Sequence, residues 1–199
     1  MSERVFAPGE GATPLTPEEE RDLAIGVASR AELNAFEREN ILEARRWALR
    51  KRVLGRKDLL SEDFLRALHR RMFGRVWRWA GKYRTSERNL GVSLPKLQVD
   101  LRLLLEDTRY WLAEGTYSAD EAAVRFHHRL VVIHPWPNGN GRHARLMADI
   151  LICHQGGQPF AWGAGNELAE PGMARQHYLA ALRAADAGDM QPLLTFARA

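Results

Sequence analysis

The sequence lacks several features that would place it in a specialised class of protein. It has a single cysteine, Cys153, so no disulfide can form within the chain, as is usual in a reducing compartment. It has no apolar run long enough to cross a bilayer, and residues 1–11 carry no secretory apolar stretch. The composition therefore predicts a cytoplasmic protein without a membrane partner.

The sequence also lacks a strong excess of charge of either sign. It has 29 Lys and Arg against 25 Asp and Glu, which gives a formal net charge of +4. The basic residues are scattered among acids, although a few cluster at 45–52, where we expect a solvated helix face. Charge alone therefore favours an anionic small ligand as much as a nucleic acid, and we do not expect nucleic acid as a partner.

Helical periodicity dominates the sequence, and it predicts an all-α fold with a single domain. Hydroxyl residues followed three positions later by glutamate, the pattern of a capping box, precede three expected helices at Thr16, Ser29 and Ser118. We predict an N-terminal arm and short helix over 1–28 and one helical domain over 29–199. The expected helices cover 29–52, 61–73, 96–114, 118–132, 141–155, 170–185 and 190–197.

One segment interrupts the helical rhythm. Residues 84–94 carry Asn89, Gly91 and Ser93, which favour turns over helix. We predict a short β-hairpin there, and we interpret it as a flap that holds an extended segment of a target protein by edge pairing. An ordinary surface hairpin is the alternative.

The most informative stretch is His134-Pro-Trp-Pro-Asn-Gly-Asn-Gly-Arg142-His-Ala-Arg145. An apolar helix delivers His134 at its end, and the prolines prevent that helix from continuing. The glycines let the backbone approach a ligand, and a new helix begins near Gly141. Because the first N–H groups of a helix have no partner within it, they form an anion site. Arg142 and Arg145 share one face of that helix, so the pattern predicts a phosphate cradle beside a basic histidine.

This stretch resembles the signature of the Fic/DOC family, His-Pro-Phe-x-Asp/Glu-Gly-Asn-Gly-Arg-x-x-Arg. The resemblance extends to Trp79-Ala-Gly-Lys-Tyr-Arg84, to the Arg175-x-x-Tyr178 pair and to Asp186-Ala-Gly-Asp189, and it spans residues 13–199. Within the family the chain is most similar to the bacterial group called mobile mystery protein B. The resemblance implies a Fic-type helical domain that transfers the AMP portion of ATP to a Ser, Thr or Tyr hydroxyl of a target protein.

The resemblance also implies a role for each matching residue. His134 would deprotonate the target hydroxyl as general base. Asn140 and the amides of Gly139 and Gly141 would hold the α-phosphate, and Arg142 and Arg145 would bind the β- and γ-phosphates. Mg²⁺ would bridge the phosphates. Gly141 favours AMP transfer, because the DOC branch, which transfers a phosphoryl group, carries lysine there.

Two positions depart from the family pattern. Trp136 replaces phenylalanine, and Asn138 replaces the acid that would hold Mg²⁺. An amide oxygen ligates a hard cation without contributing charge, so we expect weak metal binding at Asn138.

Many Fic proteins carry an inhibitory helix marked Ser/Thr-x-x-x-Glu-Gly/Asn. Residues 35–40 match it at Glu39 and Asn40, whereas Ala35 supplies no hydroxyl. We therefore expect Glu39 to pair with Arg145 and to occupy the γ-phosphate position. The alternative is that Glu39 is an ordinary exposed helix acid.

Two other functions stay open at this point. Asn138 is compatible with a nucleotide-binding regulator that has weak or no transferase activity. The pI of about 9.6 alone suggests a DNA-associated protein of a mobile element. The sequence identifies neither the target nor the modified residue, and self-modification and homo-oligomer formation are left open.

Overall fold

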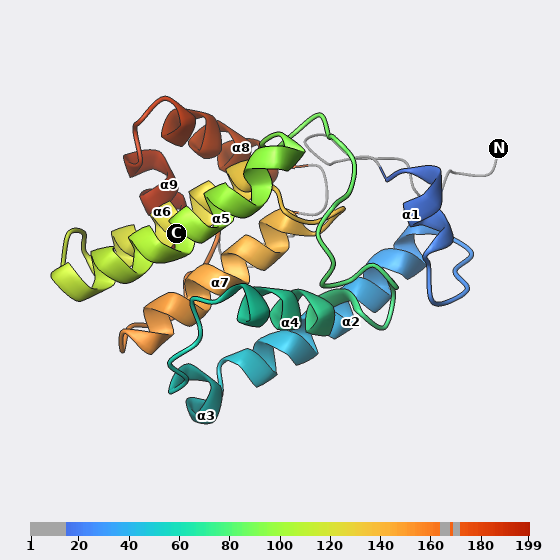
Figure 1. The fold of residues 1–199 in the computed structure, drawn as a ribbon, viewed down its shortest axis with the longest axis horizontal. Helices are drawn as coiled ribbons and strands as arrows, with labels where there is room; N and C mark the ends of the chain where they lie inside the picture. Colours follow the sequence, from blue (N-terminus) through green and yellow to red (C-terminus); the bar gives the residue numbers. More distant parts are fainter. Residues whose placement is uncertain (1–14, 164–167, 169–171) are drawn as a thin grey trace.

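The computed structural model describes residues 15–163, 168 and 172–199, and its described residues form helices joined by loops (Figure 1). The predicted arm at 1–14 lies outside the described residues. The helices are α1 (Pro17–Arg21), α2 (Arg30–Ala48), α3 (Lys51–Leu54), α4 (Glu62–Phe73), α5 (Leu94–Glu114), α6 (Ala119–Ile133), α7 (Asn140–His154), α8 (Met173–Asp186) and α9 (Gln191–Arg198).

Helix α7 is the centre of the fold. It packs against α6 on one side and α4 on the other, while α2 covers α4 and α5 covers α6 (Figure 1). Residues from Ala144 to Ile152 are almost all buried, which explains why this helix is apolar nearly all round rather than along one stripe. The end of α6 and the start of α7 therefore have fixed positions deep in the domain.

The expected helix at 29–52 is broken in the structure. Helix α2 ends at Ala48, and Arg50 has an extended backbone (φ −71°, ψ 141°) before α3 begins. The break turns Val53 into the core, and it lets the carbonyl oxygen of Leu54 lie 2.7 Å from Nδ1 of His154 on α7. Tertiary packing has overridden a continuous helical pattern here.

The predicted N-terminal helix forms, and its capping box is complete. The hydroxyl of Thr16 accepts a bond from the amide of Glu19, whose carboxylate accepts one from the amide of Thr16. At Ser29 and Ser118 the hydroxyl caps the helix, but the glutamate that follows bonds elsewhere. The segment around α1 packs on the domain through a backbone bridge between Leu23 and Trp77.

The β-hairpin expected at 84–94 is absent, because none of these residues forms a strand. The segment wraps instead around the guanidinium of Arg84. This group is fully buried and donates hydrogen bonds to the carbonyl oxygens of Ser86 and Val92. Those carbonyls point inward and so are not available for cross-strand pairing. We call residues 84–94 the Arg84 loop.

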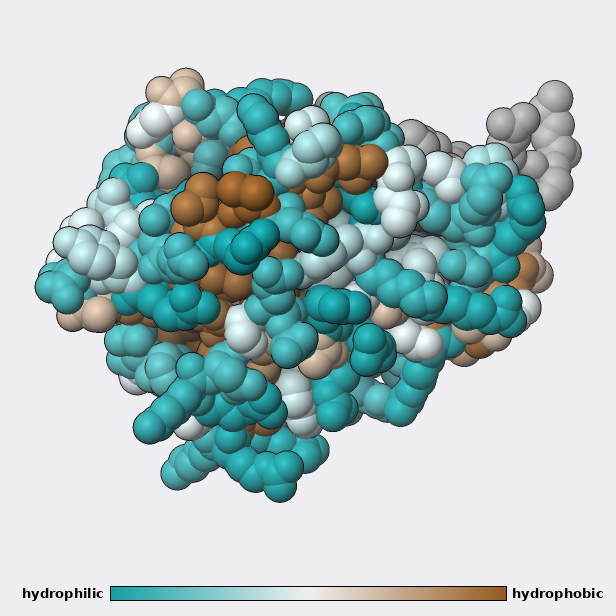
Figure 2. All heavy atoms as spheres, viewed as in Figure 1, coloured by the Kyte–Doolittle hydropathy of each residue, from teal (hydrophilic) through white to brown (hydrophobic). Residues whose placement is uncertain are grey.

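Most of the surface in view is hydrophilic, with an apolar patch over α5 (Figure 2). The exposed large hydrophobic residues on that helix are Val99, Leu103 and Tyr110. No helix in the described part of the chain is both long and apolar enough to span a membrane.

Candidate active site

The loop between α6 and α7 is held by the side chain of Asn140. Its Oδ1 accepts a bond from the amide of Trp136 (2.9 Å), and its Nδ2 donates to the carbonyl oxygen of Trp136 (2.8 Å). Both polar atoms of Asn140 are therefore used within the loop. The side chain of Asn140 thus shapes the loop, and it also lines the pocket, so its contact with the α-phosphate stays a prediction.

The start of α7 has the form of an anion site. Gly139, the residue before the helix, has a left-handed backbone (φ 80°), and no side chain among the described residues caps the helix. The first-turn N–H groups consequently lack partners inside the helix, and the helix dipole adds positive potential there. A Cβ at Gly139 would lie 2.5 Å from Cζ of Phe73, so close packing and backbone conformation both require glycine.

His134 ends α6 and also has a left-handed backbone (φ 55°), which is unusual for a residue other than glycine. Its Nδ1 lies 3.3 Å from the carbonyl oxygen of Val131, an arrangement that favours the tautomer with a proton on Nδ1 and the lone pair on Nε2. Burial lowers its pKa to about 4, and the positive charges of Arg84 and Arg88 act in the same direction. The ring is therefore neutral at pH 7 and able to accept a proton.

A pocket of about 530 Å³ connects His134 with the start of α7. One end carries the arginines and glycines of the loop, and the other end lies between α6 and α8, where apolar side chains alternate with charged ones. Among the residues that the structure describes, four arginines and two acids line it, so this lining is suited to an anionic ligand. The lining residues include Glu37, Val131, Val132, His134, Asn138, Gly139, Asn140, Gly141, Arg142, Arg145, Arg175, Tyr178, Leu179, Leu182, Arg183 and Asp186.

Arg142 is held by an acid from α2. Its Nη1 lies 2.5 Å from Oε2 of Glu37, and the other carboxylate oxygen of Glu37 accepts a bond from the indole N–H of Trp77 (2.6 Å). The side chain of Glu37 is 7% exposed. A nearly buried carboxylate is thus paired with one of the two arginines expected to bind phosphates.

Our expectation for Glu39 requires correction. Glu39 is exposed on α2, and Glu37 is the acid that reaches the α7 arginines, at Arg142 rather than Arg145. Residues two apart on a helix point about 200° from one another, so Glu37 and Glu39 cannot both face α7. Asn40, three residues beyond Glu37, shares its face and is buried. The motif match therefore selects an acid on a different face of α2 from the acid that contacts Arg142.

Arg145 lies beside Tyr178 at the opposite wall of the pocket. Its guanidinium carbon is 5.2 Å from the centre of the Tyr178 ring. A Cβ at Gly141 would lie 3.5 Å from Nη1 of Arg145 and 3.6 Å from the hydroxyl of Tyr178. A lysine at position 141 would therefore extend into the space beside Arg145, which the glycine leaves open.

The expected metal ligand is committed to other bonds. Oδ1 of Asn138 accepts from the amide of Gly139 (2.6 Å) and from Nη2 of Arg142 (3.3 Å). Mg²⁺ prefers carboxylates and phosphates, and the described residues contain no cluster of three or more His, Cys, Asp or Glu that would hold a metal. The residues around Asn138 do not fit a resident Mg²⁺.

Two buried histidines, His69 and His143, support the loop, and no sequence pattern indicates the role of His69. His69 accepts a bond from the amide of Gly81 at Nδ1 (2.9 Å) and donates from Nε2 to the carbonyl oxygen of Asn138 (3.1 Å). His143 accepts from the indole of Trp136 and donates to the carbonyl of Leu65. Burial lowers the pKa of both, so both are neutral and structural.

The geometry describes a helical domain with an anion site at the start of a helix, next to a neutral histidine. Residues 59–152 match the Fic/DOC family. The chain therefore carries a domain of the Fic/DOC family.

The relatives agree with this assignment. Protein adenylyltransferase fic-1 of Caenorhabditis elegans is 32% identical over 143 residues, which cover 70% of this chain and 27% of the relative. Protein adenylyltransferase Fic of Drosophila melanogaster gives the same values. The chain thus spans about a quarter of the length of these relatives.

Solved structures show the same fold. A fragment of Fic-1 from C. elegans is 27% identical, with a TM-score of 0.65, and the match covers 87% of this chain and 50% of that one. BepC from Bartonella tribocorum, solved with bound AMPPNP, has a TM-score of 0.68 over 92% of this chain and 97% of that one. At 15% identity, BepC supports the fold alone.

Replacing Gly139 or Gly141 by alanine should change the free energy of unfolding by different amounts. We expect Gly139→Ala to lower the free energy of unfolding by about 1–3 kcal/mol, because its Cβ meets Phe73 in a left-handed backbone. Gly141→Ala should be much milder, since its Cβ makes only ordinary contacts. Urea unfolding of both variants measures this, and equal destabilisation would contradict it.

The titration of His134 should reflect its burial. Because its folded pKa is lowered to about 4, the ring stays neutral from neutral pH down to about that value. We expect the imidazole resonances of His134, assigned by comparison with His134→Ala, to titrate well below pH 6. A midpoint near the ordinary value of 6.5 would show that the ring is solvated.

Proposed function

We propose that this protein is a protein adenylyltransferase, which transfers AMP from ATP to a Ser, Thr or Tyr hydroxyl of a target protein. One observation carries the proposal: a single pocket joins the uncapped start of α7, Arg142 and Arg145 to the neutral ring of His134. The names of the adenylyltransferase relatives support ATP as the nucleotide. The open space at Gly141 supports AMP transfer over phosphoryl transfer.

The reaction would use the residues of the pocket as follows. Nε2 of His134 takes the proton of the target hydroxyl, a role generally worth about 10²–10⁴ in rate. The hydroxyl oxygen attacks the α-phosphorus, the bond from that phosphorus to the bridging oxygen breaks, and pyrophosphate leaves. First-turn amides of α7 stabilise the negative charge that builds on the α-phosphate. Arg142 and Arg145 bind the leaving phosphates, and the end of the pocket between α6 and α8 receives the nucleoside.

Arg142 carries out this task only when Glu37 releases it. We therefore propose that Glu37, rather than Glu39, is the inhibitory residue of this domain. The carboxylate occupies the place of a phosphate oxygen at Arg142 and also repels the nucleotide. Asn40 would support it by packing on the same face of α2.

The setting of the reaction follows from the same proposal. We place it in the cytoplasm, with ATP and a protein as partners, and we propose that the chain belongs to the mobile mystery protein B group. The Arg84 loop forms the wall of the pocket next to His134 and is the surface that would meet the target. Self-modification and a homo-oligomer are compatible with this arrangement.

A second function has one observation in its favour. The side chain of Asn138 is engaged with Gly139 and Arg142 and does not fit a resident metal, which suits a regulator that binds nucleotide without transferring AMP. Such a protein would bind ATP and label nothing.

Labelling with ATP tests the transferase. Wild type and His134→Ala are incubated with ATP labelled at the α-phosphate, magnesium and a cell lysate. We expect labelled protein with wild type and a loss of about 100-fold or more with His134→Ala, because the general base is removed. Equal labelling by both would contradict the proposal, and ATP binding without labelling would favour the regulator.

The inhibitory residue is tested with matched variants on one helix. In Glu37→Gln the amide oxygen still accepts the bond from Trp77, but the charge opposite Arg142 is removed. We expect about tenfold tighter ATP binding, equivalent to about 1.4 kcal/mol, and faster labelling. Glu39→Gln should match wild type, because Glu39 is exposed. A response to Glu39→Gln alone would restore the original assignment.

A further inference from the structure

The guanidinium of Arg84 is a buried charge, and the carboxylate that pairs with it belongs to an exposed side chain. Its side chain is 0% exposed, and the carboxylate of Glu87 lies 3.7 Å away on a side chain that is 61% exposed. The guanidinium is solvated mainly by carbonyl oxygens. Since an uncompensated buried charge is costly, these carbonyl contacts must be well formed for Arg84 to be tolerated.

On one side these contacts hold the turn that carries His134. Nε of Arg84 donates to the carbonyl oxygen of His134 (2.7 Å), and the backbone amide of Arg84 donates to the carbonyl oxygen of Pro135 (2.9 Å). One residue therefore binds two successive carbonyls of the turn. A left-handed backbone costs a residue other than glycine about 1–2 kcal/mol, and these bonds help to offset that cost at His134.

On the other side the same guanidinium organises the wall of the pocket. Nη1 donates to the carbonyl oxygen of Ser86 (3.1 Å), and Nη2 donates to that of Val92. This folds the Arg84 loop so that Gly91 lies directly against His134. A Cβ at Gly91 would be 2.7 Å from Cβ of His134, and Gly91 has φ +105°.

We propose that Arg84 is a positioning residue, which fixes the imidazole of His134 and the Arg84 loop in one rigid arrangement facing the target hydroxyl. The catalytic consequence rests on the proposed function, because it assumes that His134 acts as the base. Arg84 itself touches no reacting atom. It acts by fixing the position of His134 relative to the Arg84 loop.

The geometry requires an arginine. The bonds to His134, Ser86 and Val92 leave from three different nitrogens of a planar group, whereas lysine has one nitrogen. Arg84→Lys keeps the positive charge near His134 and loses the simultaneous bonds. The variant therefore separates an effect of geometry from an effect of charge.

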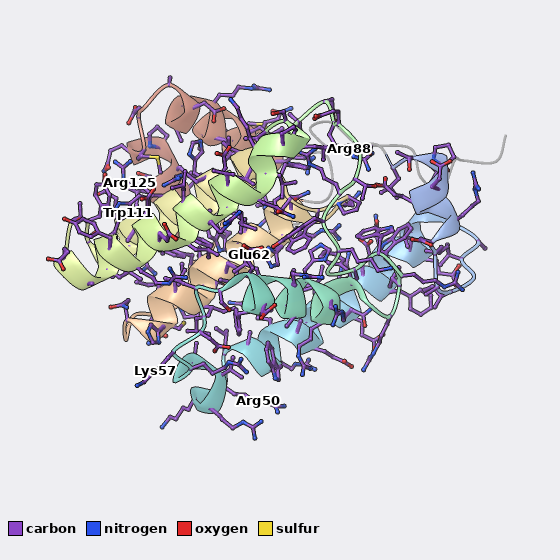
Figure 3. The ribbon with its side chains drawn as sticks, in the orientation of Figure 1. Arg50, Lys57, Glu62, Arg88, Trp111 and Arg125 are labelled. Atoms are coloured by element: carbon purple, nitrogen blue, oxygen red, sulfur yellow. The ribbon has the colours of Figure 1, made fainter. Side chains whose placement is uncertain are left out.

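A second anchor of the same loop provides the control. Arg88, which is labelled in Figure 3, lies on this loop. Its guanidinium pairs with Glu19 of α1, and both side chains are nearly buried. Glu19→Gln weakens this pair, while glutamine retains the oxygen that accepts from the amide of Thr16. The Glu19→Gln substitution weakens the attachment of the Arg84 loop at Arg88, and it leaves the bonds of Arg84 to the carbonyls of the His134 turn in place.

The first measurement is independent of activity. Imidazole titrations by NMR compare wild type, Arg84→Lys and Glu19→Gln. We expect the midpoint of His134 to move from about 4 toward 6.5 in Arg84→Lys, because a released ring becomes solvated. The charged groups that act on the ring are Arg84 and Arg88, and both variants keep positive charge at these positions. Glu19→Gln should titrate as wild type does.

The second measurement is labelling with α-labelled ATP, together with the affinity for ATP. We expect Arg84→Lys to lower the labelling rate by about 10–100-fold with ATP affinity within about twofold of wild type, because the base is displaced while the arginine cradle is intact. Glu19→Gln should label at the wild-type rate. If Arg84→Lys does not fold, Gly91→Ala, which presses the loop away from His134, is judged in its place by the same criteria.

The outcomes are separable. An unchanged His134 titration in Arg84→Lys, or equal changes in Arg84→Lys and Glu19→Gln, would overturn the positioning role. A shifted titration in Arg84→Lys alone, in a protein whose wild type labels nothing, would support the positioning of His134 and refute the adenylyltransferase. A shifted titration with unimpaired labelling would show that Arg84 has no part in catalysis.

Discussion

The first turn of α7 concentrates positive potential, and the surrounding structure is arranged around that constraint. Unpaired amides, the helix dipole, Arg142 and Arg145 all point their positive ends at one pocket. Without an anion these groups repel one another. In the structure Glu37 supplies a carboxylate at Arg142, and an ATP phosphate would supply the same charge. The proposed activity and the proposed inhibition are therefore two ways to neutralise one site.

The rigidity of this site comes from atoms that do not face the ligand. Asn140 closes the loop on Trp136, His69 holds the carbonyl of Asn138, and Arg84 holds the carbonyl of His134. Each uses a side chain to fix a backbone group. Because α7 is buried between α4 and α6, these bonds connect the loop to the core.

The sequence predicted local features well. Prolines after His134, glycines at 139 and 141 and arginines three apart indicated a helix junction with an anion site, and the structure brings these residues to one pocket. Helix starts marked by Thr16, Ser29 and Ser118 were also correct within a residue, because capping depends on neighbours in the chain.

The failures involve contacts between distant segments. No local signal distinguishes Glu37 from Glu39, since the choice depends on which face of α2 meets Arg142, 105 residues away. The turn residues of 84–94 suggested a hairpin, but the buried guanidinium of Arg84 took the carbonyls that strands would have needed. His69 was missed because both its partners lie outside its own helix.

The indole of Trp77 has a consequence for how a ligand would enter. It holds one oxygen of Glu37, so the carboxylate stays anchored even when its other oxygen loses Arg142. An incoming phosphate would not meet a flexible acid that swings aside; it would compete with a stationary one. Weak nucleotide occupancy would then be the resting condition.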